Sequence, residues 1–420
     1  MASVVPAVLR SEPQFRLLFI GQALSMLGDR VTFVALPFAV LSIGGSATDV
    51  GIVIAAATIP FALFALLGGV WADRLPRHRL MLASDLVRMV TQAIAAVLLL
   101  AGSAEVWQLA VLMAIFGTAD AFFAPALTGL LPAVVAPERL QEANALRSLV
   151  LSSGLVIGPA IAGVLVALAG PGGAIAIDAA TFAASSVALA LLRPRTVARV
   201  DAVEPTLLQG LREGFAEVRA RRWVQVFLAV LCAYHVVVLP AIFVLGPVLA
   251  ERELDGAQTW AIVTAGFGAG AILGDLLILR WKPSRPLLVA ALAFVVASCQ
   301  AAIVGSGLPV WGIAGLEAVT GVAVSVGFTL WETTLQEQIP ERSISRVSSY
   351  DYLVSVGLMP VGLALAGPLE ALVGLHELLA LQTAVAVPMA LAALAVPAIR
   401  DLRRATPATA AGGSASVGSA

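Results

Sequence analysis

The chain has 420 residues, of which 60% are hydrophobic and only 12% are charged. A soluble domain carries roughly 25% charged residues, so this chain cannot cover its apolar side chains with a polar surface in water, and lipid must be its solvent. Its net charge of −1 argues against a nucleic-acid-binding protein.

Twelve apolar segments are long enough to cross a bilayer, for which about 20 residues suffice. Breakers such as Gly44-Gly45 and Gly305-Ser306-Gly307 separate them. The predicted fold class is therefore an all-α membrane protein with twelve transmembrane helices. We expect these helices at residues 16–42, 47–71, 79–101, 106–131, 141–168, 171–193, 222–250, 257–279, 286–305, 308–332, 345–372 and 375–398.

The loops that join these segments alternate in charge. Arginines collect in every second joint, whereas the other joints hold almost only acids, with Arg252 as the single basic exception. Because positive charge collects on the cytoplasmic side of a membrane, both termini are predicted to be cytoplasmic. The predicted location is the bacterial cytoplasmic (inner) membrane, which the chain would cross many times.

Two motifs recur at nearly equal offsets. Pro137-Glu138-Arg139 returns as Pro340-Glu341-Arg342, 203 residues later (340 − 137). Arg74 is matched by Arg280, 206 residues later (280 − 74). Such offsets indicate two parallel halves, which is the architecture of a secondary transporter whose binding site lies where the halves meet.

The predicted organisation is a six-helix bundle at 1–193, a cytoplasmic linker at 194–221, a second six-helix bundle at 222–398 and a disordered cytoplasmic tail at 399–420. Apolar residues recur at helical spacing in the linker. They predict either an amphipathic helix on the membrane surface or a solvated linker helix.

The joint between the second and third segments carries a recognisable motif. Gly69-Val-Trp-Ala-Asp73-Arg74-Leu-Pro-Arg77-His78-Arg79 resembles the cytoplasmic loop signature of the major facilitator superfamily. That resemblance implies the fold of two six-helix bundles, transport by alternating access and a loop that gates the cytoplasmic side. An ordinary positive-inside loop is the alternative interpretation.

The fifth segment contains Gly154, Gly158, Pro159 and Gly163, which resemble the signature that exporters of this family carry in the same helix. Glycines at four-residue spacing let two helices approach closely, and the proline permits a bend. The resemblance implies export, whereas plain helix packing is the alternative.

Further stretches resemble bacterial exporters of the macrolide-efflux and enterobactin-exporter type, and the resemblance covers nearly all of residues 15–398. Among these stretches are Gly28-Asp29, Asp85-Leu-Val-Arg88 and Ala143-Asn144. One departure concerns the fourth segment, where many drug/proton antiporters place an arginine. Here that segment has none and its only charge is Asp120, so the coupling scheme of those proteins does not carry over.

Charged residues inside a bilayer cost about 3 kcal/mol each on insertion scales, so each is expected to have a structural or functional role. A carboxyl group removed from water can bind and release protons near neutral pH, as a proton-coupled exporter requires. The candidates for proton coupling are Asp29, Asp120, Glu317 and Asp178. For Asp29 a structural ion pair with another helix is the alternative.

Other charges fall near the predicted cytoplasmic face. Asp85 and Arg88 are spaced i, i+3, which suits a local pair on one helix. We interpret this group as a cytoplasmic gate. Its predicted members are Gly69, Asp73, Arg74, Arg77, Arg79, Asp85, Arg88 and Asp351.

The predicted substrate cavity is mostly apolar and aromatic, which suits amphipathic or lipophilic molecules. Its candidate residues are Phe33, Phe123, Asn144, Trp260, Phe328 and Trp331. Lipid contact or core packing is the alternative for each. His235 lies within the seventh segment, either as a proton relay or as a histidine satisfied by a neighbouring helix.

No Gly-Lys-Ser/Thr phosphate loop, catalytic constellation or metal-ligand spacing occurs in the sequence. We therefore expect no enzyme, no cofactor and no metal site. The predicted function is export of a small lipophilic drug or metabolite by proton antiport, by a monomer in membrane lipid. The alternatives are an importer or uncoupled facilitator, and a membrane sensor or scaffold of the same fold without transport.

Overall fold

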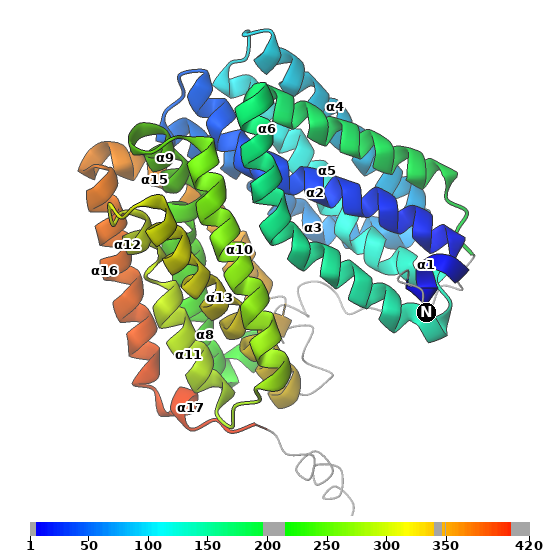
Figure 1. Cartoon of the computed structure of the whole chain (residues 1–420). Coiled ribbons are helices and arrows are strands. Elements are labelled where there is room, and N and C mark those ends of the chain that lie inside the picture. Colours follow the sequence, from blue (N-terminus) through cyan, green and yellow to red (C-terminus); the bar gives the residue numbers. More distant parts are fainter. Residues whose placement is uncertain (1–5, 196–214, 340–346, 349, 405–420) are drawn as a thin grey trace, which may run out of the picture.

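The computed structural model describes residues 6–195, 215–339, 347–348 and 350–404, and this part of the chain contains helices and no strand (Figure 1). The N-terminal half consists of α1 (Ala7–Ser11), α2 (Pro13–Ser42), α3 (Ala47–Arg74), α4 (Arg77–Leu100), α5 (Val106–Val134), the 3₁₀ turn η1 (Pro137–Arg139) and α6 (Leu140–Leu191).

The described residues of the C-terminal half form three short π-helical turns among the α-helices. Its elements are α8 (Arg222–Ala233), η2 (Tyr234–Val238), η3 (Ala241–Leu245), α9 (Gly246–Glu253), α10 (Ala257–Arg280), α11 (Pro286–Ala297), α12 (Gln300–Val304), α13 (Val310–Gln338), η4 (Leu353–Gly357), α15 (Met359–Val373), α16 (Leu375–Leu394) and α17 (Pro397–Arg400).

Within the described residues, 11 helical stretches are long and apolar enough to cross a membrane. One of them, Val156–Leu191, has 36 residues and contains Gly170 at φ 69° and ψ 173°. Only glycine adopts this backbone geometry readily, and Pro171 can begin a new helix because its missing N–H is not needed there. The whole helix α6 therefore holds the fifth and sixth predicted segments, and the described residues of each of the twelve predicted segments are mostly helical.

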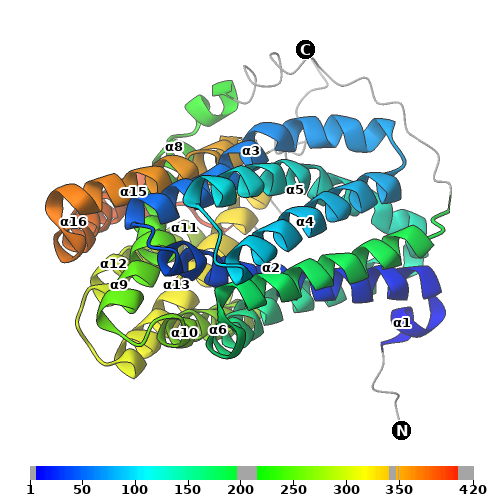
Figure 2. The same cartoon turned by 90° about the horizontal axis from the view of Figure 1, so that it is seen from above.

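The helices form two bundles that lie side by side, with α2–α6 in one and α8–α17 in the other (Figures 1 and 2). The predicted fold class is confirmed by this arrangement. Most of the linker (196–214) and of the tail (405–420) lies outside the described residues. Of the predicted linker helix, residues 215–220 are helical, and Val218 is buried in the C-terminal bundle.

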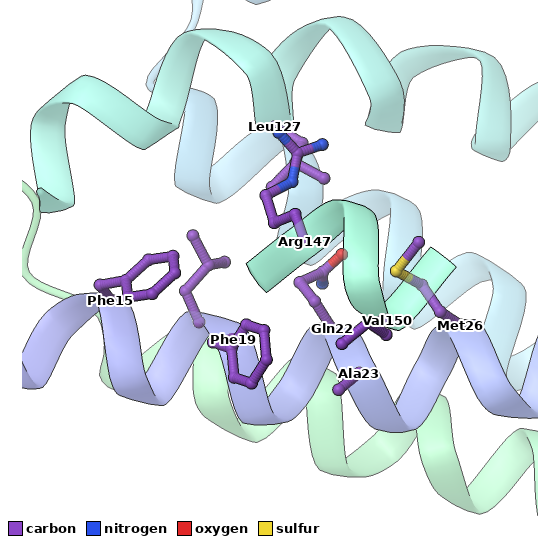
Figure 3. Close-up of a pocket in the computed structure, with 9 residues that line it drawn as sticks. Phe15, Phe19, Gln22, Ala23, Met26, Leu127, Arg147 and Val150 are labelled. Atoms are coloured by element: carbon purple, nitrogen blue, oxygen red, sulfur yellow. The ribbon is translucent and has the colours of Figure 1, made fainter. Parts of the chain in front are cut away.

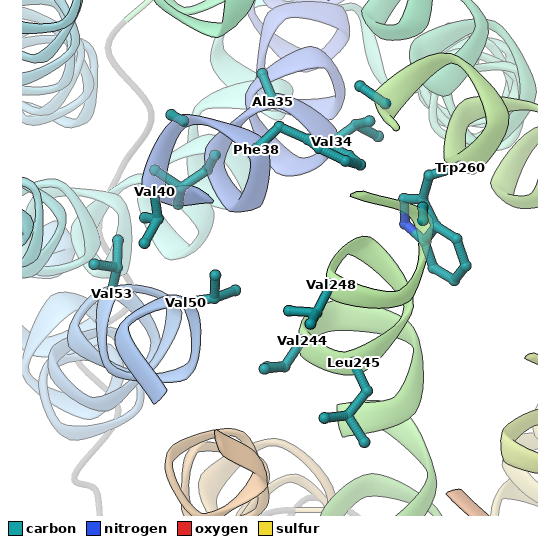
Figure 4. Packing of buried hydrophobic residues seen from close by; sticks show 14 of the residues in the cluster. Val34, Ala35, Phe38, Val40, Val50, Val53, Val244, Leu245, Val248 and Trp260 are labelled. Atoms are coloured by element: carbon teal, nitrogen blue, oxygen red, sulfur yellow. The ribbon is translucent and has the colours of Figure 1, made fainter. Parts of the chain in front are cut away.

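The two ends of the molecule differ in how the bundles meet. We call the end with loops 43–46, 101–105, 254–256 and 305–309 the distal end, and the opposite one the terminal end. At the distal end a single apolar cluster contains buried residues of both bundles, among them Phe38, Val50, Val248 and Trp260 (Figure 4). Towards the terminal end each bundle has its own cluster, centred on residues such as Leu130 in one and Trp331 in the other.

Close helix contacts reinforce this distal packing. A Cβ atom on Gly51 of α3 would lie 2.4 Å from the carbonyl oxygen of Leu363 in α15, and one on Gly367 would lie 2.1 Å from the backbone of Thr48. Glycine at these positions lets the backbones of α3 and α15 touch. The bundles are therefore joined tightly at the distal end.

Candidate functional site

A cluster of charged side chains lies inside the N-terminal bundle, around Arg88 of α4. The Arg88 guanidinium is ion-paired with Asp85 one turn away, as the i, i+3 spacing predicted. It also lies 3.0 Å from Asp120 of α5 and 3.9 Å from Asp29 of α2. One cation thus faces three carboxyl groups from three helices.

Aromatic rings complete the surroundings of Arg88, which is only 2% exposed. The guanidinium carbon lies 4.3 Å from the centroid of the Phe123 ring and 4.5 Å from that of Phe182. Ring faces attract a cation, more strongly where water is excluded. The rings and carboxyl groups together hold Arg88 in a fixed position, away from bulk water.

The fourth acid of this bundle, Asp178 of α6, is fully buried and satisfied by hydrogen bonds. Thr32 donates to its Oδ2 atom at 2.7 Å, and Gln92 donates to the same atom at 2.6 Å. A Cβ atom on Gly28 would lie 2.3 Å from Asp178 Oδ1. Glycine at 28 therefore lets α2 approach α6 closely enough for these bonds to form.

Among the described residues of the C-terminal bundle, the comparable buried acid is Glu317 of α13, which is 1% exposed. Its Oε2 atom accepts hydrogen bonds from Gln300 at 2.9 Å and Thr320 at 2.8 Å. Tyr234 donates in turn to Gln300 at 2.7 Å. The Oε1 atom of Glu317 is buried and has no hydrogen-bond partner in the described structure.

A cavity of about 280 Å³ lies between the bundles and is bounded largely by aromatic and aliphatic side chains. From the N-terminal bundle it is lined by Arg30, Phe33 and Pro159. The lining from the C-terminal bundle consists of Tyr234, His235, Leu239, Ile242, Phe243, Trp260, Val263, Thr264, Phe267, Glu317, Val324 and Phe328. Its size and apolar walls are those of a small-molecule site.

The predicted exporter motif lies against this cavity. A Cβ atom on Gly158 would lie 2.3 Å from Cβ of Arg30, and one on Gly154 would lie 3.6 Å from its Cγ. Gly163 faces the other bundle: a Cβ atom on Gly163 would lie 2.5 Å from Cβ of Ala261 in α10. The first two glycines therefore accommodate the stem of Arg30, and the third permits contact between α6 and α10.

The structure brings together only some of the predicted cavity residues. Phe33, Trp260 and Phe328 line the cavity. Phe123 instead packs against Arg88, and Trp331 is fully buried and stacked on Phe227 at 4.4 Å between centroids. Asn144 is exposed near the start of α6. These three were predicted to line the cavity and do not, because position along a span does not specify which way a side chain faces.

The predicted gate residues are dispersed. Asp85 and Arg88 lie inside the N-terminal bundle, whereas Arg77 and Arg79 lie in the first turn of α4. Asp351 accepts a hydrogen bond from Trp331 at 3.0 Å. Gly69, Asp73 and Arg74 belong to the last turns of α3, but the side chains of residues 65–74 lie outside the described part of the structure.

A much smaller pocket, of about 20 Å³, lies inside the N-terminal bundle. Phe15, Phe19, Gln22 and Met26 of α2 line it together with Arg147 of α6 (Figure 3). It has room for about one water molecule, so it is too small for a substrate.

Sequence reasoning missed three polar residues of this region: Arg30, Gln92 and Gln300. Gln92 and Gln300 lie in apolar runs, and Arg30 directly follows Asp29 within another. A polar side chain in a membrane span usually faces a partner or a cavity, and this signal could have identified all three.

Comparison with known proteins agrees with this architecture. The family model described as Major Facilitator Superfamily matches residues 18–363. "Macrolide efflux protein A" of Streptococcus pyogenes is 24% identical over 398 residues, which cover 93% of this chain and 97% of that protein. "Multidrug efflux pump Tap" of Mycolicibacterium fortuitum is 30% identical over 394 residues, which cover 89% of this chain and 93% of the pump.

Solved structures show the same fold at low sequence identity. The crystal structure of the nucleoside transporter NupG aligns with a TM-score of 0.71 at 14% identity, over 91% of this chain and 98% of that one. A bacterial homologue of the human lysosomal transporter Spinster, in an inward-facing and occupied conformation, aligns with a TM-score of 0.70 at 15% identity, over 96% of this chain and 100% of that one. The chain belongs to the Major Facilitator Superfamily, and it is a multi-pass membrane transporter and not an enzyme.

Proposed function

We propose that this transporter exports a small lipophilic drug or metabolite from a bacterial cell in exchange for protons. The observation that carries the proposal is the arrangement of Asp29, Asp85 and Asp120 around Arg88. Similarity over most of the chain to two efflux proteins supports the direction of transport.

Charge balance is the physical reason for proton coupling. Three ionised carboxyl groups around one guanidinium would leave two uncompensated negative charges in a low-dielectric bundle. Uncompensated buried charge is costly, so the cluster favours binding protons, and the acids share them as a coupled group. The side chains of Asp29 and Asp120 are each 37% exposed, whereas that of Asp85 is 0% exposed. Asp29 and Asp120 are therefore the members that protons can reach.

We infer the orientation from the arginine-rich loops, which support a cytoplasmic location for both termini and for the terminal end. The distal packing of α3 on α15 then closes the outer side, and the separate terminal clusters leave the bundles free to part on the inner side. In this interpretation the described conformation is inward-facing. Alternating access would require the shared distal cluster to separate while the segment from Gly69 to Arg79 meets the other bundle.

Asp29→Asn is expected to abolish proton-coupled export without loss of expression, because the amide cannot exchange a proton. Inside-out vesicles with an established proton gradient would receive macrolides, dyes, tetracyclines and siderophores one at a time, while a pH-sensitive dye reports the gradient. We expect at least one compound to collapse the gradient in wild-type vesicles and none to do so in the variant. Asp255→Asn is the matched control, since Asp255 is exposed in a loop and should leave the response unchanged.

Other outcomes would point to the alternatives. If a labelled compound moves across the membrane without dissipating the gradient, the protein is an uncoupled facilitator and proton antiport is wrong. If expression of the protein supports growth on a nutrient, the protein is an importer. A sensor or scaffold would move no compound and would tolerate Asp29→Asn, but would lose its activity on alteration of the 194–221 linker.

A further inference from the structure

The central cavity is lined by one basic and one acidic side chain from opposite bundles. Arg30 of α2 and Glu317 of α13 both line it. The other lining residues include His235 and Tyr234, and the remainder are apolar apart from Thr264, whose hydroxyl group donates to the backbone of its own helix. A ligand in this space therefore meets one cation on one side and one carboxyl group on the other.

The guanidinium of Arg30 lacks an ion-pair partner among the described residues. The carboxyl group of its neighbour Asp29 lies towards Arg88, at 3.9 Å, and no carboxylate of the described part lies within ion-pair distance of Arg30. The stem of Arg30 lies against Gly158 and Gly154, so α6 limits where the side chain can move. Arg30 thus presents an uncompensated positive charge to the cavity.

The carboxyl group of Glu317, on the opposite side of the cavity, also lacks a partner at one of its two oxygen atoms. Gln300 and Thr320 both donate to Oε2, which orients the carboxyl group and leaves Oε1 buried with no partner. Buried polar atoms without a partner are rare, and each calls for an explanation. Glu317 borders the cavity but is only 1% exposed, so a donor carried by a ligand would supply the missing hydrogen bond after the carboxyl group turns towards the cavity.

We propose that the cavity binds an amphoteric aromatic molecule, which carries an acidic group for Arg30 and a basic amine for Glu317. A ligand that is only cationic would leave Arg30 facing a positive charge. A ligand that is only anionic would leave Glu317 facing a negative charge. The aromatic walls, among them Phe33, Trp260 and Phe328, hold the ring system between the charges. Such a ligand connects the two bundles, so its binding would favour conformations in which both contact it. This inference rests on the proposed transport function and names its substrate class.

The test uses norfloxacin, its ethyl ester and its N-acetyl derivative as probes on one scaffold. The first carries both a carboxylate and an amine, the second lacks the free acid, and the third lacks the basic amine. Equilibrium dialysis against the purified full-length protein in detergent would measure each dissociation constant without any proton gradient. We expect norfloxacin to bind at least about tenfold more tightly than either derivative, because each charged hydrogen bond contributes that much or more.

Two variants identify which cavity side chain binds the carboxylate of norfloxacin and which binds its amine. Arg30→Gln should weaken norfloxacin binding by about tenfold, to the level of the ester, and leave ester binding unchanged. Glu317→Gln should weaken norfloxacin binding to the level of the N-acetyl derivative and leave binding of that derivative unchanged. Arg30→Lys should recover part of the affinity that Arg30→Gln loses. Arg252→Gln, outside the cavity and paired with Glu370 on the surface, is the control and should bind all three probes like wild type.

The proposal is overturned if wild-type protein binds the three probes equally or binds none of them. It is equally overturned if either cavity variant weakens all three probes to the same extent. Its failure is separable from that of proton antiport, because dialysis involves no gradient. A protein that discriminates among the probes as expected but never collapses a proton gradient would retain this substrate class and refute the coupling.

Discussion

Arg88→Gln is expected to lower the free energy of unfolding by about 3–5 kcal/mol, the usual cost of removing one partner from a buried ion pair, and to abolish transport. The substitution leaves Asp29, Asp85 and Asp120 without a cation, in a site where Arg88 is 2% exposed. It also removes the charge that Phe123 and Phe182 contact. Thermal unfolding of the purified protein, followed by intrinsic fluorescence, would measure the loss of stability.

The double variant Asp85→Asn/Arg88→Gln tests the cause. Because it removes the buried carboxylate together with its partner, it should recover part of the stability without recovering transport. Arg252→Gln is the matched control, since the Arg252 side chain that pairs with Glu370 is 48% exposed and pairs with an exposed arginine contribute at most about 1 kcal/mol. If Arg88→Gln unfolds at the same temperature as wild type, the cluster is not an electrostatic unit and the charge-balance basis for proton coupling fails.

Gly367→Ala should open the distal end of the transporter. The added Cβ atom would lie 2.1 Å from both the backbone nitrogen and Cα of Thr48, where only a displacement of α15 from α3 can relieve the overlap. Overpacking of this kind costs about 1–3 kcal/mol, which shifts a two-state equilibrium by roughly 5- to 150-fold. The closed distal conformation would therefore lose population to a conformation open at that end.

Labelling of a cysteine at Val50, which is fully buried in the distal cluster, would report this shift. In a background with Cys232 and Cys299 replaced by serine, a membrane-impermeant maleimide should react with Val50→Cys at least about fivefold faster when Gly367→Ala is present. Gly315→Ala is the matched control, because a Cβ atom there has no neighbour within 4 Å. Equal labelling rates in the two glycine variants would show that α3 and α15 do not control access from this side.

Several features of this protein follow from local sequence alone. Hydrophobicity over about 20 residues marks each span, and the turn at Gly170-Pro171 follows from the backbone freedom of one residue and the ring of the next. The pairing of Asp85 with Arg88 follows from helix geometry, since residues three apart share a face. The resemblance of the 69–79 loop and of Gly154–Gly163 to family signatures also lies in contiguous sequence, which is why the superfamily could be recognised before the fold was known.

Other features depend on how helices rotate and pack. Asp120 lies 32 residues from Arg88 in sequence, and Gln92 lies 86 residues from Asp178, so no local pattern predicts these contacts. Trp331 and Phe328 are one turn apart in α13, yet Trp331 stacks inside the bundle and Phe328 lines the cavity. In lipid every face of an apolar helix is an acceptable surface, so hydrophobicity predicts that a segment spans the membrane but not which side faces a cavity. Close packing at Gly28, Gly158 and Gly367 determines those rotations, and it exists only once the helices have come together.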